Sequence, residues 1–335
     1  MIYIPFYFFF FINLIFGRLI SVSSGNWLYI WMGLEINLLS FIPLIARGVN
    51  EIEVERSLKY FLVQALGSSL ILFGCFTLCR GPNAIFSSYI GDFILFFSIL
   101  IKIGIFPFHY WLPHVIGGIS WISCILLSIW QKFGPLFIIR GLVSNIYISF
   151  LLLIGRLGSI VGGLGGINQS QIRILLAYSS IGHISWILIG IFCSFNILLY
   201  YYIIYRFIII SIILLICFYP IKMININRYI IFPLYIIILL SILFLSLGGL
   251  PPFLGFYPKL TVIISRSINN MYFCLFILIL GSLINIFYYL SIFFNLFMKS
   301  IFCGFNNRLI MLNKYQILLI SIFFIASTFS LFLIL

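Results

Sequence analysis

The chain has 335 residues, of which 64% are hydrophobic and only 7% are charged, whereas roughly 25% of the residues in a soluble domain are charged. This composition excludes a soluble globular protein and makes the lipid bilayer the expected surroundings. The 18 basic and 5 acidic residues give a formal charge of +13, but the basic residues are scattered singly through apolar sequence, so nucleic-acid binding is not expected.

Apolar runs of about 20 residues recur along the chain, and each is long enough to cross a bilayer as a helix. We predict an all-α polytopic membrane protein of about 11 transmembrane helices, forming one domain over residues 1–335. The first run lacks the basic region and cleavage site of a signal peptide, so it is expected to span the membrane. The predicted helices, in chain order, cover residues 2–20, 26–46, 57–79, 88–106, 114–143, 148–166, 171–193, 196–220, 234–264, 271–297 and 315–335.

Charges in the predicted loops indicate the orientation of the helices, because short loops rich in Lys and Arg stay on the inner face. The N-terminal side collects Arg47, Arg56, Lys59, Arg173, Lys222, Arg228, Lys299, Arg308 and Lys314, and the opposite side collects Arg18, Arg80, Arg140 and Arg266. The N-terminus is therefore predicted to face the negative compartment and the C-terminus the opposite side.

Four charged residues fall inside predicted helices, namely Glu35, Lys102, Lys132 and Lys259. A charge at mid-helix costs about 2.5–3.5 kcal/mol on an insertion scale, so each one needs a reason to be there. Because the four lie on different helices, they can form a series of protonatable sites across the bundle interior. The alternative is structural, since each side chain could snorkel to an interface or lock two helices through an ion pair.

Two of the lysines lie beside clusters of proline and glycine. Lys102 precedes Pro107 in LIKIGIFPFHYWLPHV, and Lys259 follows Pro251 and Pro252 in GGLPPFLGFYPK. Proline removes a helical hydrogen bond, so both helices are predicted to be interrupted near the middle of the bilayer. Paired interrupted segments are typical of transporters built from inverted repeats, with ion sites at the breaks. The pattern predicts a transporter-like inverted-repeat bundle with two broken helices.

Lys132 is followed by a third proline in IWQKFGPLF. Pro135 has no N–H to donate, so it leaves the carbonyl of Gln131 without its helical partner. Lys132 is therefore expected to lie beside a loosened helical turn.

The remaining titratable residues are secondary candidates. Lys59 lies near a helix start, where snorkelling is the favoured interpretation, and the run Glu51, Glu53 and Glu55 is interpreted as a solvated loop. His109 and His114 are expected to line a helix break as proton relays, because no third ligand for a metal follows them.

His183 lies at mid-helix among Ser179, Ser180 and Ser185. This polar stripe is consistent either with a proton relay or with close helix packing.

Other patterns carry no catalytic chemistry. The seven Cys form no CxxC pair and are interpreted as small hydrophobic residues. Gly162 to Gly166 follow a predicted helix rather than a strand, so they indicate helix packing and not a dinucleotide-binding loop. No metal or redox cofactor site is expected.

Six segments in this order resemble the subunit 2 family of mitochondrial respiratory complex I, whose members are similar to sodium/proton antiporter subunits. The segments are WMGLEINLLSFIPL, LKYFLVQALGSSL, LIKIGIFPFHYWLPHV, IWQKFGPLF, RILLAYSSIGHISWI and GGLPPFLGFYPK. The resemblance implies an 11-helix membrane-arm subunit in the mitochondrial inner membrane, with its N-terminus in the matrix and its C-terminus on the intermembrane side. It also implies that Glu35, Lys102, Lys132 and Lys259 are proton-path residues and that His183 lies on the hydrophilic axis.

The implied mechanism is proton pumping driven at a distance by quinone reduction in other subunits. Glu35 and Lys102 would form a switchable ion pair, Lys132 would relay protons, and Lys259 would lead to the intermembrane side or the next subunit. No cofactor is expected in this chain, with flavin and iron–sulfur clusters in partner subunits and subunits 4L and 4 as neighbours. Two alternatives remain open: a separate cation/proton antiporter, and a scaffold whose charges form fixed ion pairs.

Overall fold

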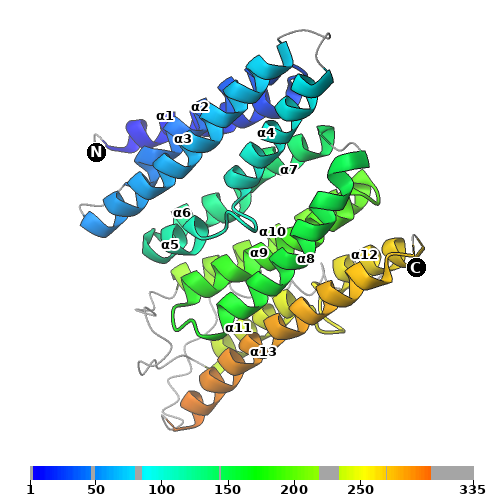
Figure 1. Cartoon of the computed structure of the whole chain (residues 1–335). Helices are drawn as coiled ribbons and strands as arrows, with labels where there is room; N and C mark the ends of the chain where they lie inside the picture. The colour runs from blue at the N-terminus through cyan, green and yellow to red at the C-terminus, as the bar shows by residue number, and fades with distance from the viewer. Residues whose placement is uncertain are drawn as a thin grey trace. The chain divides into compact units, whose positions relative to one another are not determined.

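The structure is a computed structural model that describes residues 3–46, 50–79, 85–142, 145–218, 234–268 and 270–302. Every regular element within these ranges is a helix, which confirms the predicted all-α class (Figure 1). Residue contacts divide the chain into two compact units, Met1–Phe150 and Leu151–Leu335, and each is described by itself. The helix predicted at 315–335 lies outside the described residues.

Eight helical segments among the described residues are long and apolar enough to cross a membrane. Many of their outward side chains are large and apolar, as at Phe8, Leu66 and Phe287, which suits contact with lipid tails. The eight segments are α1 (Tyr3–Ser23), α2 (Trp27–Ile45), α3 (Glu51–Cys79), the run of α6 (Trp121–Ile125), η1 (Leu126–Trp130) and α7 (Gln131–Gly141), α8 (Asn145–Ile167), α9 (Ile172–Ile191), α10 (Phe195–Phe218) and α13 (Tyr272–Phe302).

In the first unit, α1 and α2 lie side by side (Figure 1) and approach each other closely at two glycines. A Cβ added to Gly17 would lie 2.7 Å from the carbonyl oxygen of Gly33, and a Cβ on Gly33 would lie equally close to the oxygen of Gly17. Only residues without a side chain permit this approach. It brings Arg18, next to Gly17 on α1, close to Asn37, one turn beyond Gly33 on α2.

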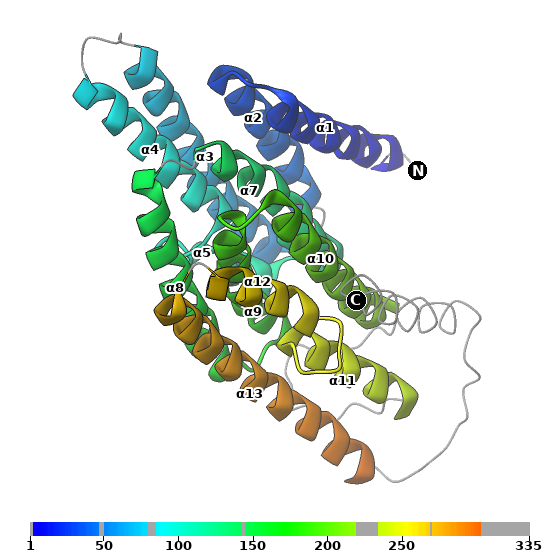
Figure 2. The same ribbon diagram turned by 90° about the vertical axis from the view of Figure 1, so that its right-hand side faces the viewer.

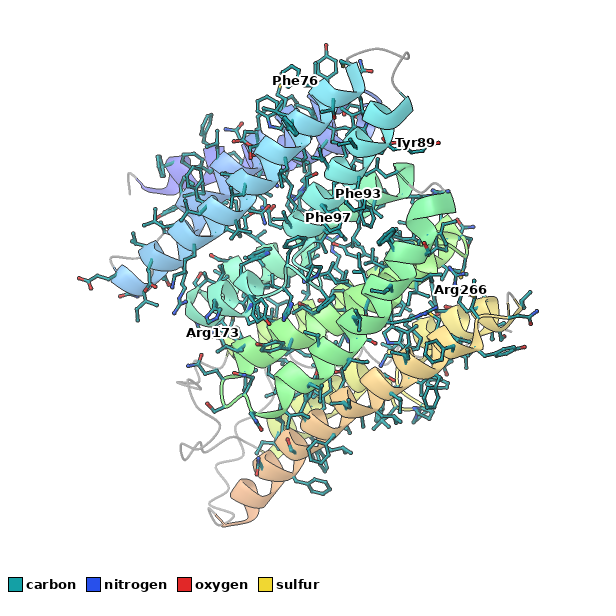
Figure 3. The ribbon with its side chains drawn as sticks, in the orientation of Figure 1. Phe76, Tyr89, Phe93, Phe97, Arg173 and Arg266 are labelled. Atoms are coloured by element: carbon teal, nitrogen blue, oxygen red, sulfur yellow. The ribbon has the colours of Figure 1, made fainter. Side chains whose placement is uncertain are left out.

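The first predicted interruption is confirmed: α4 (Ile85–Ile103) ends directly after Lys102, and α5 (Trp111–Gly118) begins after a non-helical stretch. Gly104 starts the break with a φ of +73°, a conformation that glycine adopts without steric cost. Phe93 and Phe97 lie along α4 with ring centroids 4.6 Å apart (Figure 3). The ring of Phe108 within the break packs 6.0 Å from that of Phe97, so aromatic packing covers the interruption.

The single helix predicted at 114–143 is wrong. The structure separates α5 from the helical run that carries Lys132 by a turn at Ile119 and Ser120. The Ser120 side chain accepts a hydrogen bond from the backbone N–H of Ser123 and so caps α6, a helix-starting role typical of serine. The segment after the break is therefore a short half-helix.

The predicted loop at Glu51, Glu53 and Glu55 is also wrong, because α3 begins at Glu51. Carboxylates in a first turn interact favourably with the positive end of the helix dipole, which explains why this acidic run is helical.

In the second unit, α9 is buried along nearly its whole length and packs against α10, α12 and α13. A Cβ on Gly162 of α8 would lie 2.7 Å from the backbone nitrogen of Gly182 on α9. This close approach agrees with the helix-packing interpretation of the glycines at 162–166 and places α8 directly beside His183.

The second predicted interruption is confirmed as well. The helix α11 (Leu234–Gly248) ends before a loop, which Figure 2 shows in yellow, and α12 (Phe256–Ile268) follows it. Gly249 opens this loop with a φ of +79°. Lys102 precedes its break, whereas Lys259 lies in the first turn after its break.

Candidate functional site

The centre of the first unit contains a buried arginine that the sequence analysis wrongly counted among the loop charges. Arg18 is 3% exposed. Its Nη2 donates to the backbone carbonyl of Gln131 at 2.6 Å and also to the side-chain Oε1 of Gln131. This carbonyl is the one that Pro135 deprives of its helical donor, so α1 supplies the missing hydrogen bond.

Asn37 of α2 joins Arg18 and Gln131 in one polar cluster. With its side-chain amide turned so that the oxygen faces Arg18, that oxygen accepts from Nη2 at 2.8 Å and from Nε at 3.1 Å. Three helices, α1, α2 and α7, thus meet through hydrogen bonds at the turn that carries Lys132.

Lys102 is buried at a small cavity beside this cluster. The polar side chains lining the cavity are Arg18, Asn37, Tyr60, Gln64, Lys102 and Gln131. The stem of Lys102 crosses α3 at Gly67, where an added Cβ would lie 3.0 Å from the lysine Cγ. A polar cavity of this kind offers partners for water, which suits a lysine that exchanges protons.

The break after Lys102 leaves helix-terminal carbonyls that side chains satisfy. Gln64 Nε2 of α3 donates to the carbonyl of Lys102 at 3.3 Å, and Trp111 Nε1 of α5 donates to the carbonyl of Ile101 at 3.2 Å. The last carbonyls of a helix have no partner within the helix, so these two donors hold the broken end in place.

Glu35 is half-buried and interacts electrostatically with Lys102, as does Arg18. Within the described residues no ion pair shorter than 4 Å joins Glu35 to Lys102, and the buried Oε2 of Glu35 accepts no hydrogen bond there. A direct contact between the two charges is therefore not formed in this structure, and their pairing through one water stays a prediction.

Lys132 is 2% exposed and ranks among the largest fully buried side chains. It is the second residue of α7, which begins directly after η1, a stretch of π-helix, and such widened turns occur frequently at functional sites. The helix α7, which carries Lys132, packs against α4, which carries Lys102. The first unit thus places both predicted lysines on contacting elements.

In the second unit, Lys259 reaches back across its helix break. Its buried Nζ donates to the carbonyl of Gly248, the last residue of α11, at 2.5 Å and lies 6.0 Å from the ring centroid of Trp186. A Cβ on Gly249 would lie 2.7 Å from this Nζ, so the glycine makes room for the ammonium group. Lys259 therefore binds the carbonyl end of one half-helix.

His183 lies one turn before Trp186 on α9 and contacts two buried tyrosines, Tyr201 and Tyr205. Its Nδ1 lies 3.0 Å from the hydroxyl of Tyr201 on α10, and its ring centroid lies 5.0 Å from that of Tyr205. Tyr288 and Tyr289 of α13 are buried as well. Sequence reasoning missed these hydroxyls because tyrosines in the apolar runs were counted as hydrophobic.

Arg266 is a second arginine that was wrongly predicted to lie in a loop. It is buried near the end of α12 (Figure 3), where its Nη2 donates to the carbonyl of Ile189 at 2.9 Å. Ile189 lies in the last turn of α9, so Arg266 satisfies a carbonyl at that helix end.

The structure does not bring the secondary candidates together into one site. Lys59 is half-exposed and forms an ion pair with Glu55, one turn earlier on α3. His109 is buried in the first break with its Nδ1 3.2 Å from the carbonyl of Pro107, whereas His114 is exposed on α5. Across the described ranges, no group of three His, Cys, Asp or Glu side chains could hold a metal ion.

Comparisons with known proteins agree with this architecture. Residues 24–285 match the family described as NADH:quinone oxidoreductase/Mrp antiporter, transmembrane. A chain of respiratory complex I from Thermus thermophilus superposes with a TM-score of 0.74 at 20% identity, covering 87% of this chain and 70% of that one. A chain of the membrane-bound sulfane sulfur reductase, an archaeal respiratory membrane complex, superposes with a TM-score of 0.82 at 17% identity, covering 96% and 72%.

A closer sequence relative narrows the family. NADH-ubiquinone oxidoreductase chain 2 of Anopheles gambiae is 40% identical over 299 residues, which cover 87% of this chain and 86% of the relative. Identity of this extent, together with the match over both helix breaks, shows that this chain belongs to the NADH-ubiquinone oxidoreductase chain 2 family.

Proposed function

We propose that this chain is a proton-translocating membrane-arm subunit of H+-translocating NADH:ubiquinone reductase in the mitochondrial inner membrane. The observation that carries the proposal is the placement of buried lysines at helix irregularities: Lys102 and Lys259 at the two breaks and Lys132 after the π-helical turn. Irregular backbone inside a membrane is tolerated where it is buried in protein or lines a hydrated cavity, and such sites bind ions in transporters.

In the first unit, Glu35 and Lys102 act as the switchable pair. Their attraction depends on whether each group carries its charge, so a change in their separation changes how strongly the amine holds its proton. Arg18 keeps a fixed positive charge at the same cavity, because a guanidinium does not release its proton. Lys132, on the helix that contacts α4, is the next group to exchange a proton.

In the second unit, Lys259 and His183 continue the path. The carbonyl of Gly248 is a neutral acceptor that can hold the protonated lysine without trapping it in an ion pair. The hydroxyl of Tyr201 can both accept and donate, so it suits proton transfer to or from the His183 ring. Protons leave from Lys259 toward the intermembrane side or the next subunit.

Redox chemistry belongs to partner subunits in this proposal. The chain holds no NADH site or redox centre, the flavin and iron–sulfur clusters lie in other subunits, and subunits 4L and 4 are the neighbours. The N-terminus faces the matrix. Arg18 and Arg266 are buried and no longer count as loop charges, so only Arg80 and Arg140 remain among the loop charges of the opposite side. The excess of positive loop charge on the N-terminal side is therefore larger than the sequence alone suggested.

The proposal is tested by replacing Lys102 with Met in the assembled complex. Lys102→Met keeps the apolar volume and removes the amine, so we expect assembly on a native gel with loss of coupled proton translocation. Lys59→Met, on an exposed lysine of the neighbouring helix, is the control and should pump normally. Normal pumping by the Lys102→Met complex contradicts the proposal. Failure of the unmodified chain to migrate with an NADH-oxidising complex contradicts it too, and this result favours a separate antiporter.

A further inference from the structure

The outer face of α10 carries an arginine that the proton path does not use. Arg206 is exposed, 11 residues after Phe195 and 11 before Cys217, the two ends of the segment of α10 that is long and apolar enough to cross a membrane. At a rise of 1.5 Å per residue, Arg206 lies about 16 Å from either end. An arginine side chain is too short to snorkel over that distance to the headgroups.

The rest of α10 shows that this face points away from the second unit. Tyr201, Tyr205 and Ile208 are buried where α10 packs against α9, α11 and α12 (Figure 2). Ile203, three residues before Arg206 and therefore on the same side of the helix, is 61% exposed. The guanidinium thus projects from the middle of an apolar, outward-facing surface.

The second unit has no carboxylate side chain that could neutralise Arg206. The five acidic residues of the whole sequence are Glu35, Glu51, Glu53, Glu55 and Asp92. The buried cations Lys259 and Arg266 instead donate to backbone carbonyls. Arg206 makes no hydrogen bond, ion pair or ring contact with the described residues.

We propose that the outer face of α10 is an interface for a membrane-spanning segment of another subunit, which presents an aspartate or glutamate to Arg206. A charged side chain facing lipid at this depth is costly, and arginines inside membranes pair with opposite charges or backbone carbonyls. A carboxylate receives two parallel hydrogen bonds from a guanidinium, so this pair fixes both the depth and the rotation of the partner helix. The inference goes beyond proton pumping and rests on the proposed function only for the presence of neighbouring subunits.

The direct test is an experimental structure of the assembled complex. We expect a carboxylate oxygen of another chain within 4 Å of the Arg206 guanidinium. A guanidinium that contacts only lipid, or only groups of this chain, overturns the inference.

Variants of Arg206 give an independent test by native gel during titration with a mild detergent. The two complexes are compared at the detergent concentration that releases half of the unmodified subunit. At this concentration the Arg206→Met variant should leave about tenfold less intact complex, because the partner carboxylate becomes unpaired. Arg206→Lys keeps the charge and should retain most of the complex, and Ile203→Met is the control on the same face. Equal detergent resistance of the Arg206→Met and unmodified complexes overturns the inference. Failure of the proposed function is a separate result, since Lys102→Met tests pumping in a complex that stays assembled.

Discussion

Arg18 supplies a hydrogen bond that Pro135 removes from α7. Pro135 removes the hydrogen bond of the Gln131 carbonyl, and the guanidinium on α1 replaces it at 2.6 Å. The same guanidinium lines the cavity that holds Lys102. A structural hydrogen bond and a fixed positive charge thus come from a single side chain beside two lysines of the proposed proton path.

We predict that Arg18→Met destabilises the subunit by about 2 kcal/mol, because a buried carbonyl loses a charged donor. The measurement is the thermal midpoint of the complex, followed by native gel, which should fall. Arg140→Met, at an exposed position in the last turn of α7, is the control and should leave the midpoint unchanged. Equal midpoints for the two variants would show that the Gln131 carbonyl does not need Arg18.

Tyr201 allows a smaller change to be tested in the second unit, the removal of a single hydroxyl beside His183. Tyr201→Phe keeps the buried ring and removes the hydroxyl that lies 3.0 Å from His183 Nδ1. One such hydrogen bond contributes about 0.5–1.5 kcal/mol, so we expect turnover to fall by roughly twofold to tenfold with normal assembly. Tyr272→Phe, at an exposed tyrosine, is the control. Unchanged turnover of the Tyr201→Phe complex would show that the Tyr201 hydroxyl takes no part in the proposed proton path.

The sequence predicted some of these residues well and others poorly, for a physical reason. Lys102, Lys132 and Lys259 interrupt long apolar runs, so their charge alone marks them as exceptional. Arg18 and Arg266 lie near the ends of predicted helices, where a loop charge and a buried charge look alike. Only the fold shows which carbonyls these arginines reach.

At the scale of elements, the two helix breaks follow from proline and glycine, but their exact limits do not. The interruptions beside Lys102 and Lys259 were predicted correctly. The separation of α5 from α6 was missed, because it depends on a serine cap at Ser120 within an otherwise apolar run. The opposite placement of the two lysines, before one break and after the other, also required the structure.

The second break gives a prediction about a glycine. Gly249→Ala places a methyl group at a φ of +79° and 2.7 Å from Lys259 Nζ. A left-handed conformation costs a non-glycine residue about 1–2 kcal/mol, and the lysine must also move from the Gly248 carbonyl. We expect less assembled complex and a lower turnover of what assembles.

The matched control for this change is Gly25→Ala, because a Cβ at Gly25 meets no atom within 4 Å. Gly25→Ala should assemble and turn over normally. Equal behaviour of the two alanine variants would mean that the break tolerates displacement of Lys259.

At the scale of the whole molecule, the distribution of charge is strongly asymmetric along the sequence. All acidic residues lie between Glu35 and Asp92, whereas basic residues continue to Lys314. The first unit can therefore pair opposite charges internally, while the second unit satisfies its buried cations with carbonyl oxygens. This difference is readable from the sequence, but its consequence at Arg206 required knowledge of which face of α10 is exposed.

The central claim is that a buried lysine of this chain carries protons, and Lys132 tests it most directly. The measurement is proton translocation together with quinone reductase activity in assembled complexes carrying Lys132→Met or Lys132→Arg. Methionine removes the amine, and arginine keeps the charge but cannot release its proton. We predict that both complexes assemble and lose pumping and reductase activity together, because a tightly coupled pump stalls when one protonation step is blocked. Assembly with normal pumping in both variants would contradict the claim and make Lys132 a structural residue.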